Sequence, residues 1–516
     1  MKTLCGLFVL FLAALAFTNC ESGPKEKSLP PPPHTRGAIE SDYLVLALRA
    51  ADRTPDAVRK FFLYDSILET ATEAGLDTDA AVLLAYISEV LEAYEAEEWF
   101  EEYSTALTRR YLNLAMNREA IALLQEKLTR IPKLQNDLRK RLLFEEIIDI
   151  CLGGDEGFLP LLRQTIDAAL VLDDPGMKTD ILAESAARFF SRGLLKDAQE
   201  LLQLTLSQVG SLESPWDQAQ IYSRIALVYQ NMKNERRARE YANRASAEID
   251  AMQVIIRTQE EAAKVGLTAE NLLRLTTAET ALRIAMTIEY PWILAETLCR
   301  MAVFLKDDRL LDQAYGTAAA IPNNARRLST LFQLDFIMVE AKKITEVRRN
   351  LPLRDAELST IPSLAVDSYT SRLARLYLAA GDSASAIKTA ARIRDAYSKT
   401  GIIIAAARLH LEEGRAQDGF ALLDESFSLA INAGQSRDRI LQEISAAYLG
   451  AGDMEKAVRA AARISDPYVF AIATTDFIQH FLENPPQNSE GLMQILETAL
   501  EKTNPAAAPD ASKRTR

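Results

Sequence analysis

The chain has 516 residues, of which 48% are hydrophobic and 25% charged, an ordinary composition for a soluble folded protein. It is too long for one hydrophobic core, so we expect about three to four domains or one repeat array. The formal net charge is −13 and becomes −14 if Lys2 leaves with a signal segment. An acidic chain without a basic face binds nucleic acid poorly, because phosphate neutralisation supplies most of that affinity.

The chain begins with a segment typical of a secretory signal peptide. Lys2 is followed by the apolar run Leu4–Phe17 and then by short polar residues that suit a cleavage region. The apolar run is shorter than the roughly 20 residues that a bilayer-spanning helix needs, and no second run of spanning length follows. We therefore expect residues 1–19 to be removed and the mature protein to be anchored to a membrane rather than threaded through it.

The end of this segment resembles a lipobox, the bacterial lipoprotein signal whose cysteine becomes the acylated first residue. The sequence FTNC ends at Cys20. Phe17 and Asn19 replace the usual Leu and the usual Gly or Ala, which is similar to the looser lipobox of spirochaete-type lipoproteins. The resemblance implies that acyl chains such as palmitate on Cys20 hold the protein in the membrane, since each buried methylene contributes about 0.8 kcal/mol. Plain secretion after cleavage near Thr18 is the alternative.

Composition divides the mature chain into a tether, a helical region and a tail. Residues 20–40 are rich in Pro, Ser, Gly and Lys, and Pro30–Pro33 predict a stiff polyproline spacer. The apolar residues that follow recur at spacings of three and four, the period of helices, and we divide this region into arrays over 41–320 and 321–503. Residues 504–516 are expected to be disordered.

The clearest internal repeat is the pair Leu373–Ile393 and Ile444–Ile464. At an offset of 71 residues, 10 of 21 positions agree, and the agreement concentrates on one tyrosine, a Gly-Asp pair, small residues and a closing AARI. Such a pattern is typical of packing between helices and not of catalysis, because it fixes small and turn-forming residues. It predicts a protein built from stacked repeats.

The small residue shared by the two copies, Ala386 and Ala457, serves as a ruler for the other units. Equivalent positions recur at spacings of 33 to 40 residues, with two larger gaps of 76 and 72 that each fit two degenerate units. The array is therefore predicted to hold about eleven helical hairpins. The ruler positions are Ala80, Ala120, Leu159, Ala198, Ala238, Ala314, Ala386, Gly419 and Ala457.

Residue by residue, these units resemble the tetratricopeptide repeat. In that family's motif the first helix carries spaced large and small residues and an aromatic residue, Gly-Asp follows at the turn, and the second helix carries alanine. Tyr448, Gly452 and Asp453 match it, whereas Lys233 replaces the turn glycine of an earlier unit and the family's closing proline is often absent. The resemblance covers most of residues 60–480 and implies an all-α, right-handed superhelical solenoid of antiparallel hairpins.

Two segments interrupt the repeat rhythm. Residues 245–290 hold a long polar helical run, and residues 340–365 are interrupted by Pro352 and Pro362. Repeat decay is the simpler interpretation, and an inserted elbow that bends the array or contacts a partner is the other. A last helix over Glu490–Glu501 is expected to cap the final unit.

The residue types that carry catalysis or bind metals are sparse. Of three histidines, His34 lies in the tether and His410 takes the place of the repeat's tyrosine, and none has a set of ligands at metal spacing. No phosphate-binding loop, dinucleotide fingerprint or nucleophile elbow occurs. Cys151 and Cys299 fall several hairpins apart, too far for a disulfide, so we expect two buried free thiols. We predict that the protein is not an enzyme and needs no cofactor or metal.

Partner binding is the natural use of such an array, since stacked hairpins curve into an extended concave surface. In the tetratricopeptide family, residues two, five, nine and twelve of each first helix line that surface. Each position of this sequence that matches one of those groove positions could instead be an ordinary exposed helix residue that binds nothing. The Asn and Lys pattern with which some family members hold a C-terminal carboxylate is missing. The candidate groove residues are Gln220, Ser223, Gln230, Glu296, Lys306, Ser368, Ser371, Arg375, Arg439 and Gln442.

Three classes of function follow from this reasoning. The first is a lipoprotein scaffold that faces the periplasm and binds an envelope protein or peptide, similar to the repeat-containing lipoproteins of outer-membrane-protein assembly or of wall synthesis. The second is a transport accessory that docks a solute-binding protein or holds a small hydrophobic ligand, for which a closed apolar pocket would be the sign. The third, an α/α-barrel enzyme, needs converging carboxylates with His or Tyr, and the sequence offers no such set.

Overall fold

All regular structure in the described part of the chain is helical. The predicted signal peptide, Cys20, His34 and the tail 504–516 lie outside the described residues. The computed structural model describes residue 32 and residues 37–92, 100–154, 156–170, 172–251, 258–361, 365–483 and 488–503.

Twenty-five α-helices, α2 to α26, and three 3₁₀ helices, η2 to η4, are described. Those in the first half of the chain are α2 (Asp42–Asp52), α3 (Ala57–Glu73), α4 (Asp77–Glu92), α5 (Phe100–Asn113), α6 (Asn117–Arg130), η2 (Ile131–Lys133), α7 (Asp137–Gly153), η3 (Glu156–Phe158), α8 (Leu159–Leu170), α9 (Pro175–Ser191), α10 (Leu195–Val209), α11 (Pro215–Asn231) and α12 (Glu235–Ala251). Those in the second half are α13 (Gln259–Leu273), α14 (Ala278–Ala285), α15 (Pro291–Leu305), α16 (Asp308–Ala319), α17 (Asn324–Glu340), α18 (Ile344–Leu358), α19 (Val366–Ala379), α20 (Ser383–Ala390), α21 (Ala396–Glu412), α22 (Ala416–Ala430), η4 (Gly434–Ser436), α23 (Arg437–Gly450), α24 (Met454–Ala461), α25 (Pro467–Glu483) and α26 (Ser489–Lys502).

Eleven consecutive hairpins, from α3/α4 to α23/α24, follow one another among the described helices. They confirm the predicted all-α solenoid of about eleven hairpins. The hairpins α13/α14 and α17/α18 fill the two long gaps between the recurring small residues. The first interrupted segment therefore holds a hairpin of the array, and the second holds the second helix of one. Pro352 lies inside α18, and Pro362 lies outside the described residues.

In most of the described hairpins the turn between the two helices contains one residue in the left-handed conformation. Gly452 has φ 80° and Gly381 has φ 77°, and the aspartates that follow them accept the backbone N–H groups of Lys456 and Ser385 as helix caps. In four hairpins without the glycine, a non-glycine residue adopts the same left-handed conformation at a cost of about 1 kcal/mol. These residues are Ala115, Lys233, Lys306 and Lys342, with φ between 55° and 59°.

Small residues at the ruler positions let the two helices of a hairpin approach closely. A Cβ atom added at Gly419 would lie 2.6 Å from Leu411 Cγ and 3.0 Å from the Ala407 carbonyl oxygen. The seven alanines of the ruler are buried, each at most 3% exposed. Leu159 does not fit this role, because it is the first residue of α8 and is 40% exposed.

The described chain divides into two compact units. The first combines the described residues up to 168 with 466–493 and the residues from 500 on, and the second combines 169–465 with 494–499. The predicted division after residue 320 falls between α16 and α17, inside the second unit.

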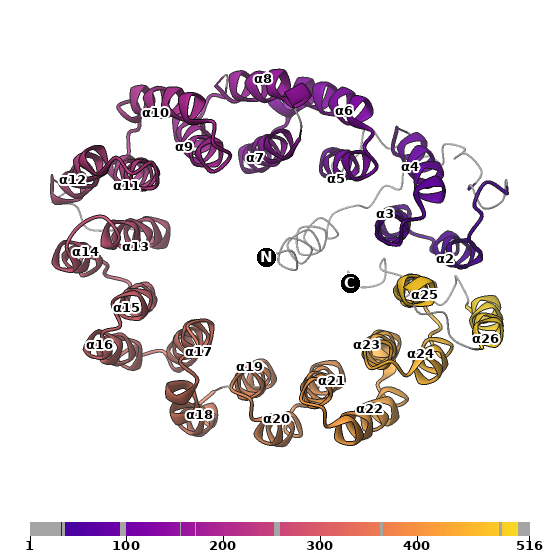
Figure 1. Ribbon diagram of the computed structural model, residues 1–516. Coiled ribbons are helices and arrows are strands. Elements are labelled where there is room, and N and C mark those ends of the chain that lie inside the picture. The colour runs from indigo at the N-terminus through magenta and orange to yellow at the C-terminus, as the bar shows by residue number, and fades with distance from the viewer. Residues whose placement is uncertain are drawn as a thin grey trace, which may run out of the picture. The chain divides into compact units, whose positions relative to one another are not determined.

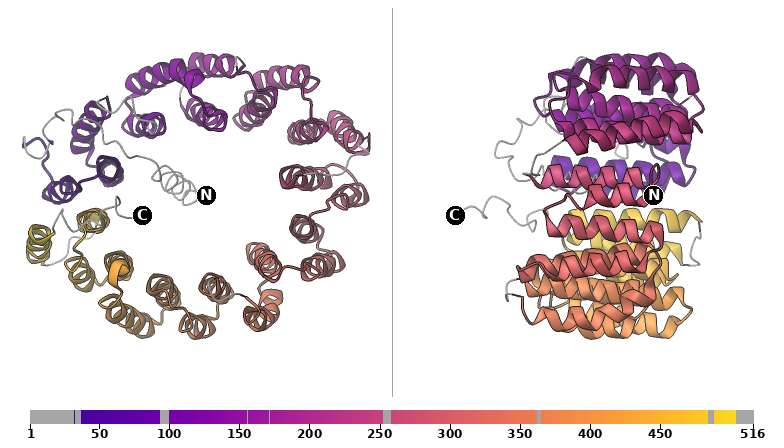
Figure 2. Two further views of the ribbon diagram at one scale, coloured as in Figure 1. Left: turned by 180° about the vertical axis from the view of Figure 1, so that it is seen from behind. Right: turned by 90° about the vertical axis from the view of Figure 1, so that its left-hand side faces the viewer.

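The second unit is an arc of stacked hairpins from α9 to α24 (Figures 1 and 2). Each first helix packs against the next first helix, whereas the second helices pack mainly against their own hairpin partners and the first helix that follows. Because the first helices are the more closely spaced row, the arc bends toward them. Their solvent-exposed stripes therefore form the concave face of this unit.

The first unit brings together helices from opposite ends of the chain. Helix α25 packs against α2 and also against α3, the first helix of the first hairpin. Tyr43 of α2 stacks on Phe481 of α25 with ring centroids 5.1 Å apart, and the guanidinium of Arg59 lies 5.2 Å from the Tyr468 ring centroid. Helix α25 thus acts as a first helix beside α3, and α2 acts as its second helix.

A buried polar network lies in the second interrupted segment, between α17 and its neighbours. Asp335 is 0% exposed, and Arg354 Nε donates to its Oδ2 atom at 2.8 Å. Tyr315 Oη at 2.7 Å and Asn350 Nδ2 at 2.9 Å both donate to the Oδ1 atom. Burial and the neighbouring carboxylate raise the pKa of Tyr315, which keeps its hydroxyl a donor. Here a charged cluster joins α16, α17 and α18.

Both cysteines expected to be free are free. Cys151 and Cys299 are buried, and burial raises the pKa of each thiol to about 12. Neither thiol is therefore a reactive thiolate at neutral pH.

Candidate partner-binding surface

The predicted groove residues all lie on or at the end of first helices of the second unit, but not all are accessible. Three are half-buried: Gln220, Glu296 and Gln442. The exposed ones are Gln230, Lys306, Ser368, Arg375 and Arg439.

Two predicted groove residues, Ser223 and Ser371, are buried, at 0% and 9% exposure. Ser223 Oγ accepts a hydrogen bond from Asn271 Nδ2 of α13 at 3.2 Å and donates to the Gln220 carbonyl at 2.8 Å. A serine that bonds to the next first helix faces its neighbour and not the solvent. Carrying over the family's groove positions was therefore wrong for these two serines, because the first helices of this array lie close together.

Lys306 was predicted to line the groove from within a first helix, but it lies in a turn. It ends α15 in the left-handed conformation, with φ 55°, and belongs to the turn that leads into α16. Its side chain is exposed, but the residue has the turn position that glycine holds in other hairpins.

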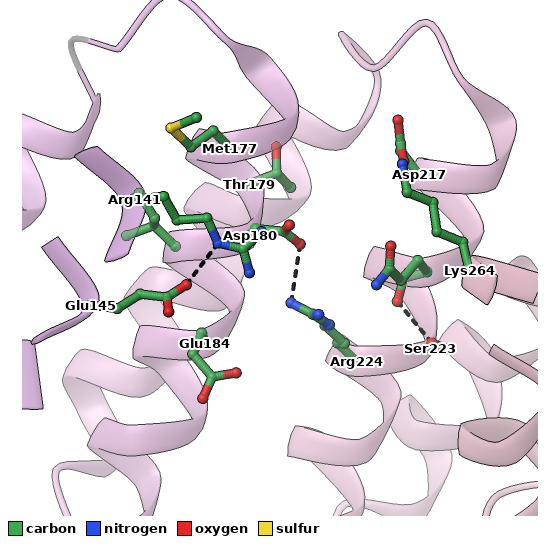
Figure 3. A network of polar contacts seen from close by, with 12 residues as sticks. Arg141, Glu145, Met177, Thr179, Asp180, Glu184, Asp217, Ser223, Arg224 and Lys264 are labelled. Atoms are coloured by element: carbon green, nitrogen blue, oxygen red, sulfur yellow. Dashed lines mark hydrogen bonds and ion pairs between the residues drawn. The ribbon is translucent and has the colours of Figure 1, made fainter. Parts of the chain in front are cut away.

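Charged side chains link successive first helices along the concave face. Arg224 Nη1 of α11 lies 3.0 Å from Asp180 Oδ1 of α9, and Lys264 Nζ of α13 lies 2.6 Å from Asp217 Oδ1 of α11 (Figure 3). All four side chains are partly shielded, between 19% and 30% exposed. These pairs fix one first helix against the next and are not available to a partner without breaking the link.

The same linkage continues with hydrogen bonds donated by uncharged side chains. Gln230 Nε2 donates to the Arg274 carbonyl at 3.0 Å, and Tyr397 Oη of α21 donates to Glu443 Oε1 of α23 at 2.6 Å. The bonded residues are 44 and 46 positions apart, close to the 44 and 47 of the two ion pairs. Sequence reasoning missed these contacts, although complementary residues at this spacing were a usable signal.

Two predicted residues, Arg375 and Arg439, come together around a third that was not predicted. The hydrogen bond to Glu443 raises the pKa of Tyr397 to about 12, while the charges of Arg375 and Arg439 act to lower it. Both guanidinium groups therefore lie within electrostatic reach of the Tyr397 hydroxyl. Arg375, Tyr397 and Arg439 come from three successive first helices, α19, α21 and α23.

Two half-buried glutamates occupy the concave face of α13 and α15. Burial raises the pKa of Glu270, and the charges of Arg300, whose Nε lies 3.8 Å from Glu270 Oε1, and of Arg274 only partly offset this. Burial likewise raises the pKa of Glu296, one of the predicted groove residues. A raised pKa means that the folded protein disfavours the ionised carboxylate relative to the unfolded chain.

We expect Glu270→Gln to stabilise the second unit at pH 7.5 and to lose this advantage as the pH falls. Because the folded-state pKa lies above the unfolded value, ionised Glu270 destabilises the fold above that pKa, and protonation removes the penalty on acidification. The ion pair with Arg300 that the change removes is long, at 3.8 Å, and partly exposed to solvent, so it contributes little. Urea unfolding midpoints of the parent and the variant at pH 7.5 and 5.0 measure the difference. Glu279→Gln on the exposed face of α14 is the control, and an advantage equal at both pH values would contradict the pKa assignment.

His410 makes a contact that at first resembles a catalytic arrangement. Its Nε2 atom lies 2.7 Å from Ser383 Oγ, and its Nδ1 atom lies 4.0 Å from Asp418 Oδ2, too far for a hydrogen bond. Tyr448 occupies the same place in the next hairpin and donates its hydroxyl to Asp424 of the preceding second helix. His410 is buried and likewise reaches the preceding second helix, so the contact is one that packs successive hairpins.

Across the described ranges, no cluster of three or more His, Cys, Asp or Glu side chains is placed to hold a metal ion. Within the same ranges, no helix has both the length and the apolar character that crossing a bilayer requires.

Comparisons with known proteins find matches only among solved structures, and these have low sequence identity and low TM-scores. No protein-family model matches the sequence, and no curated protein matches it. Among solved structures, Ton1535 from Thermococcus onnurineus NA1 aligns over 66% of this chain and 98% of its own, with 15% identity and a TM-score of 0.29. A circular tandem repeat protein with novel repeat topology aligns over 86% of this chain and 97% of its own, with 14% identity and a TM-score of 0.17.

Proposed function

We propose that the protein is a membrane-anchored lipoprotein scaffold of the tetratricopeptide type, which binds an envelope protein or peptide on the concave face of its second unit. The observation that carries the proposal is the row of first helices from α9 to α23, which pack one against the next and are joined by side-chain links between α9 and α11, α11 and α13, and α21 and α23. A continuous, internally braced surface suits recognition of an extended partner, because little of its conformational freedom is lost on binding.

The tetratricopeptide assignment is supported by details that the repeat requires. Most hairpins have a described turn residue with positive φ, several have an aspartate cap after it, and the helices approach closely at positions such as Gly419. The anchoring part of the proposal rests on the sequence around Cys20, with its short apolar run and lipobox-like ending. Together these features favour a scaffold at the periplasmic side of a membrane.

Removing the acylation site should release the protein from the membrane. We expect Cys20→Ala to move the chain from the detergent phase to the aqueous phase in detergent partitioning, because the acyl chains supply the anchor. Cys5→Ala, within the predicted signal peptide, is the matched control and should leave partitioning unchanged. The anchor assignment fails if the Cys20 variant stays in the detergent phase.

The scaffold itself is tested by site-specific photocrosslinking in native envelopes. A photoreactive amino acid at Ser368 lies on the exposed face of first helix α19, and the same group at Lys388 lies on the exposed face of second helix α20. A partner on the concave face predicts a discrete crosslinked product from position 368 and none of that size from position 388. Equal products from both positions, or none from either, would reject the scaffold.

A further inference from the structure

Four arginines gather on the exposed stripes of three neighbouring first helices. Arg372 and Arg375 lie on α19, Arg408 on α21 and Arg439 on α23, and all four are exposed. We propose that this arginine patch binds an extended acidic segment of a partner protein. The inference rests on the proposed scaffold function and names the chemistry of its partner.

The four guanidinium groups keep their positive charge available. Two cations of other first helices are matched, Arg224 with Asp180 and Lys264 with Asp217. None of the four arginines is ion-paired within the described part of the chain; Arg372 donates to the neutral Ser329 Oγ at 3.1 Å. The chain as a whole has a net charge of −13, so a surface with an excess of positive charge differs in sign from the protein as a whole.

The nearby carboxylate of Glu443 does not cancel the patch. Its Oε1 atom accepts the Tyr397 hydroxyl at 2.6 Å, so it is engaged between α21 and α23. Tyr397 is 37% exposed and belongs to α21, which packs between α19, the helix of Arg375, and α23, the helix of Arg439. Glu412 is exposed one turn beyond Arg408, so two carboxylates face four arginines and the surface stays positive, with an aromatic ring beside them.

The surface between the arginines leaves room for a polypeptide backbone. Gly401 and Ala405 of α21 and Ala446 of α23 occupy the exposed or half-buried positions there. A Cβ atom at Gly401 would meet Glu443 Oε2 at 3.9 Å, which places this glycine opposite α23. An extended chain could cross α21 and α23 over these small residues, with the Tyr397 ring beside it.

Helix spacing sets the length of the bound segment. Neighbouring helices pack about 8–10 Å apart, so the distance from α19 to α23 is roughly 16–20 Å. An extended chain advances about 3.3 Å per residue, so roughly six residues separate an acidic residue at Arg375 from one at Arg439. Guanidinium groups bind carboxylates in bidentate fashion. The overall negative charge opposes long polyanions such as nucleic acids or anionic membranes, which favours a short acidic segment.

A defined peptide tests the proposal with the full chain in detergent micelles. The probe is a fluorescein-labelled Gly/Ser dodecapeptide with glutamates at positions 3 and 9, and its counterpart has glutamines there. We expect fluorescence anisotropy to show saturable binding of the glutamate peptide that weakens with added salt, and binding of the glutamine peptide at least about tenfold weaker. Equal binding of the two peptides would overturn the proposal.

Charge reversal locates the site. Arg375→Glu with Arg439→Glu should weaken binding of the glutamate peptide by about tenfold or more, with an unchanged thermal unfolding midpoint. The matched control, Arg349→Glu with Lys388→Glu, makes the same charge change at exposed positions of second helices α18 and α20 and should leave binding unchanged. Equal weakening by both pairs, or binding to phosphatidylglycerol vesicles in place of the peptide, would overturn the inference.

The crosslinking experiment separates this inference from the scaffold proposal. If the product formed from position 368 persists in the Arg375→Glu, Arg439→Glu variant, the scaffold stands and the acidic-segment inference falls. If that product disappears while the peptide result holds, the inference is supported.

Discussion

Replacing Arg354 by alanine should lower the free energy of unfolding of the second unit by about 3–5 kcal/mol. The carboxylate of Asp335 is fully buried and would lose the guanidinium that lies 2.8 Å from it. Tyr315 and Asn350 would remain as donors, but neither carries a compensating charge. The cost comes mainly from leaving an unpaired charge in the interior. Urea unfolding followed by circular dichroism measures the change.

Two further variants separate the buried charge from a general effect of truncation. Arg349→Ala removes an exposed arginine from the same helix and should change stability by no more than about 0.5 kcal/mol. Asp335→Leu combined with Arg354→Met removes both charges and should be more stable than Arg354→Ala alone. An Arg354→Ala protein that unfolds at the urea concentration of the parent would mean that Asp335 carries no charge in the fold.

The repeat architecture could be predicted because each hairpin repeats a local pattern. An alanine or glycine at the close approach of two helices, as at Ala386 and Gly419, leaves a periodic mark in the sequence. The turn is harder to recognise in the sequence, because glycine is not always present there. Lys233 and Lys342 adopt the left-handed conformation that glycine adopts elsewhere, since the strain of about 1 kcal/mol can be offset by packing.

Contacts between hairpins could not be predicted in the same way. The pairs Asp180–Arg224 and Asp217–Lys264 join the first helices of successive hairpins, and a repeat motif does not specify them. The network around Asp335 is likewise specific to one hairpin and replaces the usual packing there. Such contacts depend on three-dimensional neighbours, so they have no fixed position in the motif.

The sequence predicted two of the four arginines of the candidate surface to be accessible residues of first helices. Arg375 and Arg439 were chosen from the family's groove positions, and both lie on the exposed stripes of their helices. Arg372 and Arg408 share those stripes but were missed, because the groove positions of the family cover only part of each exposed face. Ser371 was misplaced because it faces the interior and not the groove.

Phe481→Ala should cost about 3–5 kcal/mol of stability in the first unit and loosen the start of the described array. The Phe481 ring is 1% exposed and stacks on Tyr43, so its loss leaves a cavity between α25 and α2. Arg53, at the end of α2, donates to the carbonyl oxygens of Leu500 and Thr503. We expect trypsin to cleave after Arg53 in the variant and not in the parent, as α2 loses its main packing partner.

Leu138→Ala provides the control for this experiment, because Leu138 lies in the same unit and is 63% exposed. Its truncation removes an apolar side chain that is already in water, so stability should change by no more than about 0.5 kcal/mol and cleavage after Arg53 should not appear. If Phe481→Ala behaved like Leu138→Ala, the pairing of α2 with α25 would not be what holds these helices in place. The contrast tests whether a helix from the end of the chain completes the first unit, a contact that no repeat motif encodes.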